Sequence, residues 1–372
     1  FVPQMTAKAS GEINTRYELV DSNGIVPIRL SEKEYVRAHD FRRYLHKNLE
    51  DFIIETPLEN PLDFLNKQFD ASLIKDVQTK WIPYDFKNQN IDDFLENLNI
   101  DKTVEISSIQ GGYSNAIKQL NKFIEVGYQD YAKYRSDPSK EASSQLSPYF
   151  HSGQISTHEV FDKISELESW SPESINPKMV GRREGWWGSS ENFESFMDEL
   201  ITWRELGYHT CVRRANYNQY SSLPEWAIKT LHEHSSDERE HIYSLDELTY
   251  SQTHDEIWNA AQNQLRTQGV IQNYLRMLWG KKILEWTPNP QIALSYMITL
   301  NDRYSLDGRD PNSYSGVFWI LGRYDRAWGP ERSIFGKIRY MTSDSTARKF
   351  NLKPYLEKWG NESLGVSTSI SK

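Results

Sequence analysis

Apolar residues recur along this chain mostly at the spacing of three and four positions that marks one face of an α-helix. Between Trp286 and Asn312 they lie nearly all round the helix axis, which predicts a buried helix. Asn289 can cap its first turn, and Pro290 stands where a missing N–H is harmless. Polar residues follow the apolar run: Asn301, Asp302, Arg303, Asp307, Arg309 and Asp310. Because buried polar groups need partners, this helix is expected to deliver them to an interior or a cleft.

A second helical pattern places a carboxylate among large apolar side chains. Four residues share a helix face because they lie three and four positions apart: Phe193, Phe196, Glu199 and Trp203. On the pattern alone, Glu199 either reaches solvent or is desolvated by its neighbours, which would raise its pKa. Another helix is predicted to begin at Ser156, an N-cap residue with Glu159 three positions later.

Strand patterning is confined to the N-terminal part of the chain. Residues 16–20 read as a single strand, and a turn follows at residues 21–24. Residues 51–110 are rich in Asn and Asp, which predicts short helices in a connector. Residues 361–372 form a polar tail with nothing to pack, and we expect it to be flexible.

Composition adds a large core and a local basic region. The 372 residues are 38% apolar and 13% aromatic, with 12 Trp, which is enough for a large buried core. The formal charge of −9 argues against a polyanionic partner for the chain as a whole. From Arg276 to Lys349, however, twelve basic residues stand against seven acidic ones. This distribution predicts a local footprint for a polyanion such as DNA.

Several classes of protein are disfavoured. The single cysteine, Cys211, excludes an intrachain disulfide and suits a reducing compartment. Neither an apolar run of about 18 residues nor a signal-peptide core is found, so we expect no membrane partner. We expect an intracellular monomer, cytoplasmic with the nucleoid if the source is prokaryotic. His232, His234 and His241 lie in a hydrophilic stretch without matched ligands, so we expect a solvated loop and no metal.

The run WTPNPQIALSYMITLNDRYSLDGRDPN and the following YSGVFWILGRYDRAWGPERSIFGKIRYMTSDSTARKF closely resemble the flavin-binding region of class II cyclobutane-pyrimidine-dimer photolyases, within the photolyase and cryptochrome family. The resemblance extends more thinly over residues 17–360. It implies a mainly α protein with an all-helical FAD-binding domain at residues 111–360. Residues 1–50 would be the end of an N-terminal α/β antenna domain, largely missing here, and residues 51–110 the interdomain connector. No antenna pigment can therefore be assigned.

The resemblance implies that FAD contacts residues for which the sequence alone predicts simpler structural roles. Taken alone, the serine-rich stretch at residues 143–147 is predicted to be a loop. Arg276 and Asp307 are predicted to form a structural ion pair. In the family, residues at the Arg276 and Asp307 positions pair over the flavin ring, and Asn301 matches an Asn beside its reactive nitrogen. The remaining implied FAD contacts are Tyr131, Ser143, Ser144, Gln145, Leu146 and Ser147.

The same resemblance implies a pocket for the lesion. Glu199 would hydrogen-bond the carbonyl edge of a pyrimidine, and Trp203, Met277 and Trp319 would pack against the dimer. Arg326 and Arg339 match basic residues that occupy the space left when the lesion leaves the duplex. Without the resemblance, those two arginines are predicted to lie on a solvated face of the protein. Tyr324 stands where His is common in the family, and the loop between Trp319 and Arg326 is one residue shorter than in the family.

The spacing of three tryptophans, taken alone, predicts that they pack in the core. The resemblance makes them an electron-transfer chain, with Trp279 nearest the flavin, Trp258 beyond it and Trp286 as a branch.

Three hypotheses follow. The first is a deoxyribodipyrimidine photolyase, a carbon–carbon lyase that repairs dimers flipped out of UV-damaged double-stranded DNA by electron transfer from excited, reduced FAD. The second is a cryptochrome-like flavin photoreceptor of the same fold without repair activity. The third is a helical nucleic-acid-binding module with no flavin.

Overall fold

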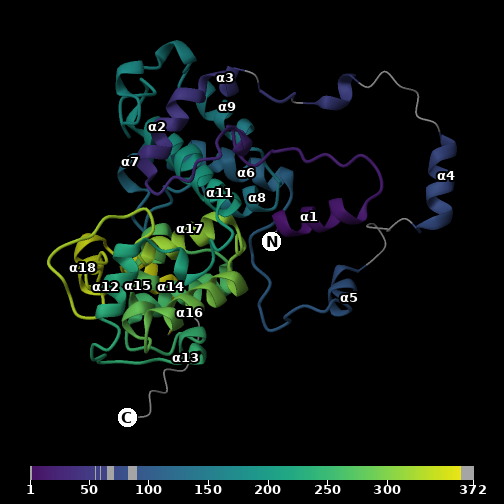
Figure 1. Cartoon of the computed structure of the whole chain (residues 1–372). Coiled ribbons are helices and arrows are strands. Elements are labelled where there is room, and N and C mark those ends of the chain that lie inside the picture. The colour runs from purple at the N-terminus through teal and green to yellow at the C-terminus, as the bar shows by residue number, and fades with distance from the viewer. Residues whose placement is uncertain (1, 55, 59, 65–70, 83–89, 362–372) are drawn as a thin grey trace. The chain divides into compact units, whose positions relative to one another are not determined.

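The computed structural model describes residues 2–54, 56–58, 60–64, 71–82 and 90–361. These residues are mainly helical, which confirms the predicted fold class (Figure 1). Within them β pairing is limited to one antiparallel bridge between Arg332 and Gly336. The chain separates into two compact units, residues 56–105 and the remainder.

Among the described residues of the larger unit, the first part of the chain forms the α-helices α1 (Val2–Glu12), α2 (Ala38–Asn48), α3 (Glu50–Ile54), α6 (Tyr113–Lys122), α7 (Tyr131–Tyr134), α8 (Ser147–His151), α9 (Thr157–Leu167), α10 (Glu191–Met197) and α11 (Arg204–Arg213). The second part forms α12 (Glu225–Glu233), α13 (Leu245–Thr249), α14 (Glu256–Gln268), α15 (Asn273–Glu285), α16 (Pro290–Tyr304), α17 (Pro311–Ile320), α18 (Ser343–Lys349) and α19 (Lys353–Trp359). Helix α15 packs against α14, α16 and α17, and α17 also packs against α11 (Figure 1).

The smaller unit consists of short helices, among them α4 (Ala71–Lys80) and α5 (Ile91–Glu96). Its described apolar side chains are largely exposed, for example Trp81 and Ile82. Little core therefore forms among the residues described in this unit. The predicted division at residues 50 and 110 stays a prediction, and the predicted flexible tail lies, apart from residue 361, outside the described residues.

The strand predicted at residues 16–20 is wrong. These residues form irregular chain, and Leu19 and Val20 are exposed. A strand needs a neighbour to satisfy its backbone groups, and none is present among the described residues. The chain instead joins the helical core a few residues later, where the backbone N–H of Ile25 donates to the carboxylate of Glu205 at 2.7 Å.

The predicted helix starts are confirmed where a side-chain cap marks them. Helix α16 begins at Pro290, with the Asn289 carboxamide accepting from the Ile292 N–H at 2.9 Å. Helix α9 begins after Ser156, whose hydroxyl accepts from the Glu159 N–H at 3.0 Å. In both cases the cap satisfies a backbone donor that has no partner within the helix.

A π-helical segment, η7 (Asp198–Trp203), joins α10 to α11 without a break. Its wider turn directs the Arg204 N–H to the Glu199 carbonyl, five residues back. Single turns of this kind inside α-helices occur frequently at functional sites. Here the segment carries both Glu199 and Trp203, two residues of the predicted substrate pocket.

Candidate functional site

One cavity of about 710 Å³ collects most of the predicted site residues. Its walls come from the loop that leads into α8, the π-helical segment η7, the start of α15, the region around α17 and the end of α19. This volume lies in the range of cavities that hold large organic ligands. The predicted residues that line it are Tyr131, Ser143, Ser144, Gln145, Leu146, Ser147, Glu199, Trp203, Arg276, Asp307 and Trp319.

The serine-rich loop at residues 143–147 lines this cavity, and its backbone conformation and side-chain contacts fix its position. Gln145 has a φ of 54°, in the left-handed region, and Leu146 is fully buried. The Ser144 carbonyl accepts from the Gln119 side chain at 2.9 Å, and the Ser147 hydroxyl donates to Asp307. These contacts leave a row of hydroxyl and backbone groups along the cavity wall, a lining suited to a phosphate-bearing ligand.

Arg276, Asn301 and Asp307 lie close together. The Arg276 Nη1 donates to the Asn301 Oδ1 at 2.7 Å, and its Nη2 lies 3.9 Å from the Asp307 Oδ1. Asn301 is 2% exposed and does not line the cavity, so it holds Arg276 from behind. A partly buried guanidinium beside the cavity, together with the serine loop, fits an anionic, phosphate-bearing cofactor such as FAD.

Glu199 reaches the cavity but has a partner that sequence reasoning missed. Its Oε1 lies 2.5 Å from the Nη1 of Arg135, and its side chain is 33% exposed. Burial raises the pKa of Glu199, while the Arg135 guanidinium opposes that rise. The carboxylate is therefore both partly desolvated and held in a fixed position. The two residues lie 64 positions apart in the chain, so the sequence holds no local signal for the pair.

Trp203 and Trp319 form a stacked aromatic wall. Their ring centroids lie 4.5 Å apart with an interplanar angle of 14°. The Trp203 indole N–H donates to the Asp198 Oδ2 at 3.2 Å. Asp198 is itself bound by the Arg42 guanidinium through contacts of 2.7 and 3.0 Å. A buried ion pair thus fixes the orientation of one wall of the cavity.

Two groups of predicted residues lie away from the cavity lining. Met277 is half-buried on α15 and is not among the lining residues. The three tryptophans of the predicted chain are 0–2% exposed, and the Trp258 indole N–H donates to the Trp279 carbonyl at 3.0 Å. The Trp258 and Trp286 rings lie 5.7 Å apart at 68°. Their roles in electron transfer stay predictions.

Two residues missed in the sequence extend this aromatic cluster toward solvent. Trp286 contacts Tyr243 and His254, with ring centroids at 5.4 and 5.2 Å. The Tyr243 hydroxyl and the His254 Nδ1 are hydrogen-bonded at 2.7 Å. His241, which the sequence placed in a solvated loop, lies with its ring centroid 4.0 Å from that of His254.

Among the described residues no group of three His, Cys, Asp or Glu side chains could hold a metal ion.

The arginines predicted to meet DNA lie on an exposed loop, on either side of a tryptophan. The guanidinium carbons of Arg326 and Arg339 lie 5.0 and 5.2 Å from the Trp328 ring centroid. Trp328 is 36% exposed, and its indole N–H donates to Asp325 at 3.1 Å. Sequence reasoning missed Trp328, although an aromatic residue two positions from a predicted DNA-contacting arginine was the available signal.

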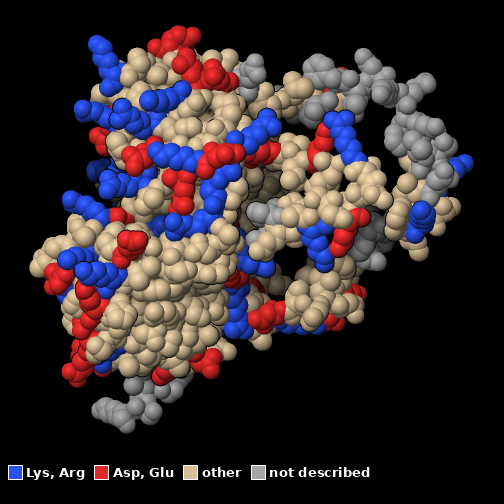
Figure 2. Space-filling view, viewed as in Figure 1, with Lys and Arg blue, Asp and Glu red and all other residues tan. Residues whose placement is uncertain are grey.

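Basic and acidic side chains are mixed on the face of the molecule that Figure 2 presents. Figure 2 shows Lys and Arg interspersed with Asp and Glu on the face it presents, without one continuous basic field. None of the described helices has the length and apolar character that a membrane span requires.

Known proteins resemble this chain over most of its length. A deoxyribodipyrimidine photo-lyase from Methanothermobacter thermautotrophicus is 35% identical over 352 residues, covering 94% of this chain and 70% of that protein. One from Potorous tridactylus is 35% identical over 344 residues, covering 91% of this chain and 58% of that protein. The chain thus spans 58–70% of the length of these two relatives. No family model matches it.

A solved structure shares the fold. The bacterial class III photolyase from Agrobacterium tumefaciens superposes with a TM-score of 0.58 at 18% identity, covering 91% of this chain and 61% of that one. At this identity the likeness establishes the fold alone.

Proposed function

Because this chain belongs to the deoxyribodipyrimidine photo-lyase family of enzymes, we propose that it carries out light-driven repair of cyclobutane pyrimidine dimers in DNA, as a class II type member. One observation carries the proposal. A partly desolvated carboxylate, Glu199, and a stacked aromatic pair, Trp203 and Trp319, line the same cavity as Arg276 and Asp307. A substrate that is both flat and rich in carbonyl groups suits that combination.

FAD is the proposed cofactor, held by the serine loop together with Arg276 and Asp307. When bound and reduced, it supplies the light-excited electron that opens the dimer. Arg276 provides positive charge near the ring, and Asn301 fixes the direction of that guanidinium through the 2.7 Å hydrogen bond. Ser147 and Asp307 are hydrogen-bonded to each other, so the loop and the ion pair form one connected wall.

The proposed substrate is damaged double-stranded DNA with the dimer flipped out. Glu199, kept in place by Arg135, would hydrogen-bond the pyrimidine carbonyl edge, with Trp203 and Trp319 packing against the rings. Met277 is also proposed as an adaptable contact with the dimer. Because Met277 does not line the cavity, the substrate would have to reach beyond the present lining to touch it. Arg326, Arg339 and the intervening Trp328 would meet the duplex where the lesion has left it.

The proposed test is dimer repair by the purified, FAD-loaded protein under blue light, measured as loss of dimers from irradiated DNA. Glu199→Leu should lower the repair rate about a hundredfold, because the hydrogen-bonding carboxyl group aimed at the pyrimidine carbonyl edge is lost. Glu191→Leu removes an exposed carboxylate from the same helical stretch and serves as the matched control. Equal rates for the two variants would remove Glu199 from the mechanism.

A photoreceptor of the same fold is the alternative, and Tyr324 is the feature that favours it. Tyr324 lines the cavity, replaces the His common in the resembled family, and donates to the Thr210 hydroxyl at 2.7 Å. If flavin photoreduction persists while no dimers are lost from irradiated DNA, the photoreceptor replaces the repair enzyme. If no flavin binds at all, both proposals fail.

A further inference from the structure

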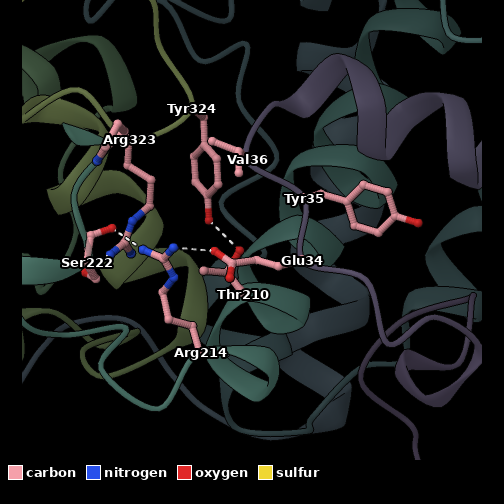
Figure 3. Close-up of a pocket in the computed structure, with 9 residues that line it drawn as sticks. Glu34, Tyr35, Val36, Thr210, Arg214, Ser222, Arg323 and Tyr324 are labelled. Atoms are coloured by element: carbon pink, nitrogen blue, oxygen red, sulfur yellow. Dashed lines mark hydrogen bonds and ion pairs between the residues drawn. The ribbon is translucent and has the colours of Figure 1, made fainter. Parts of the chain in front are cut away.

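A second, much smaller cavity, of about 40 Å³, lies beside Arg323 (Figure 3). It brings together the segment around Glu34, the end of α11 at Arg214, and the turn that follows α17. Tyr324 lines this cavity as well as the large one. Nothing in the proposed repair chemistry uses the remaining side chains here.

Arg323 is a buried cation with neutral partners. It is 4% exposed, and its guanidinium lies over the Phe318 ring at 3.9 Å. Its Nη2 donates to the Tyr217 carbonyl at 2.8 Å and to the Ser222 hydroxyl. The Nε is buried and makes no hydrogen bond. No ion pair joins Arg323 to any acidic side chain that the structure describes, although buried charges ordinarily require such a partner.

A second arginine adds to the positive charge. Arg214 forms an ion pair with Glu34 at 2.6 Å and donates to the Ser222 carbonyl. In Figure 3 its guanidinium lies next to that of Arg323, beside Ser222. Two guanidinium groups therefore face one carboxylate, which leaves an excess of one positive charge at the cavity. Burial lowers the pKa of Arg323 to about 10, so the group remains charged at neutral pH.

We propose that this cavity binds one small monovalent inorganic anion, of which chloride is the physiological example, between Arg323 and Arg214. The cavity exceeds the roughly 15 Å³ that a single water requires, so it has room for an ion of this size. The anion neutralises the excess positive charge of the two guanidinium groups. By doing so it ties the Glu34 segment to the turn that carries Arg323 and Tyr324.

The test is thermal unfolding of the purified protein at constant ionic strength, with gluconate replaced stepwise by chloride or bromide. A ligand that binds only the folded state raises the unfolding temperature until the site saturates. We expect a saturable rise in the wild type and its loss in Arg323→Gln. Lys229→Gln removes an exposed positive charge from α12 and should leave the chloride dependence unchanged.

A second variant tests the same site in the opposite direction. Glu34→Gln removes the carboxylate that competes with the anion for Arg214, so it should tighten chloride binding about fivefold, which corresponds to about 1 kcal/mol. Glu34 is 38% exposed, so this variant decides the matter if Arg323→Gln does not fold. The proposal is overturned if unfolding shows no saturable chloride dependence, if Arg323→Gln retains it, or if Glu34→Gln leaves the affinity unchanged.

Discussion

The buried ion pair between Arg42 and Asp198 gives a prediction whose size follows from the structure. Arg42→Met removes a guanidinium whose side chain is 9% exposed and leaves Asp198, at 4%, as a buried charge. Breaking such a pair typically costs about 3–5 kcal/mol. Two groups soften the loss, because Arg183 lies 3.8 Å from the Asp198 carboxylate and the Trp203 indole still donates to it. We therefore expect a destabilisation of about 3 kcal/mol, at the lower end of that range.

The assay is urea unfolding followed by circular dichroism, with Arg43→Met as the control. Arg43 is the next residue on α2 and is exposed, so its replacement should change the free energy of unfolding by less than about 0.5 kcal/mol. A double variant, Arg42→Met with Asp198→Leu, should recover much of the lost stability because no unpaired charge remains. Equal stabilities for Arg42→Met and Arg43→Met would refute the assignment of this pair as a support of the cavity wall.

Three further predictions concern other parts of the molecule. Burial raises the pKa of Glu205 from 4.5 to about 7, so its contribution to stability declines as pH rises between these values; Glu205→Gln should flatten that part of the unfolding profile. Trp279→Phe should block light-driven reduction of oxidised flavin, seen by absorbance, yet spare repair after chemical reduction; loss of both contradicts the proposed chain. Arg326→Ala and Arg339→Ala should each reduce the salt dependence of DNA binding by about one phosphate contact, and an unchanged slope excludes that contact.

Local signals in the sequence predicted the helix ends well. Asn289, Pro290 and Ser156 act within a few residues of their own positions, so their effect needs no knowledge of the fold. The strand at residues 16–20 failed for the opposite reason. Alternating side chains make a strand possible, but only a neighbouring strand can bind its backbone, and that neighbour cannot be read from the segment itself.

Most of the predicted site residues line one cavity, but their contacts could not be predicted from the sequence. Glu199 could be identified as a carboxylate on an apolar face, whereas Arg135 meets it only because α7 packs against α10. Likewise, the hydrogen bond from Arg276 to Asn301 joins side chains 25 positions apart, for which the sequence holds no local signal. Partners of buried polar groups depend on tertiary packing, so spacing along the chain alone cannot supply them.

The π-helical segment η7 makes the pocket sensitive to chain length at one place. Each residue of an α-helix advances the chain by about 100° around the axis. Deleting one residue from η7 would restore ordinary winding and turn either Glu199 or Trp203 away by about that angle, while α10 and α11 could remain helices. A related protein with one residue fewer in this segment could thus keep the fold and still bind its ligand more weakly.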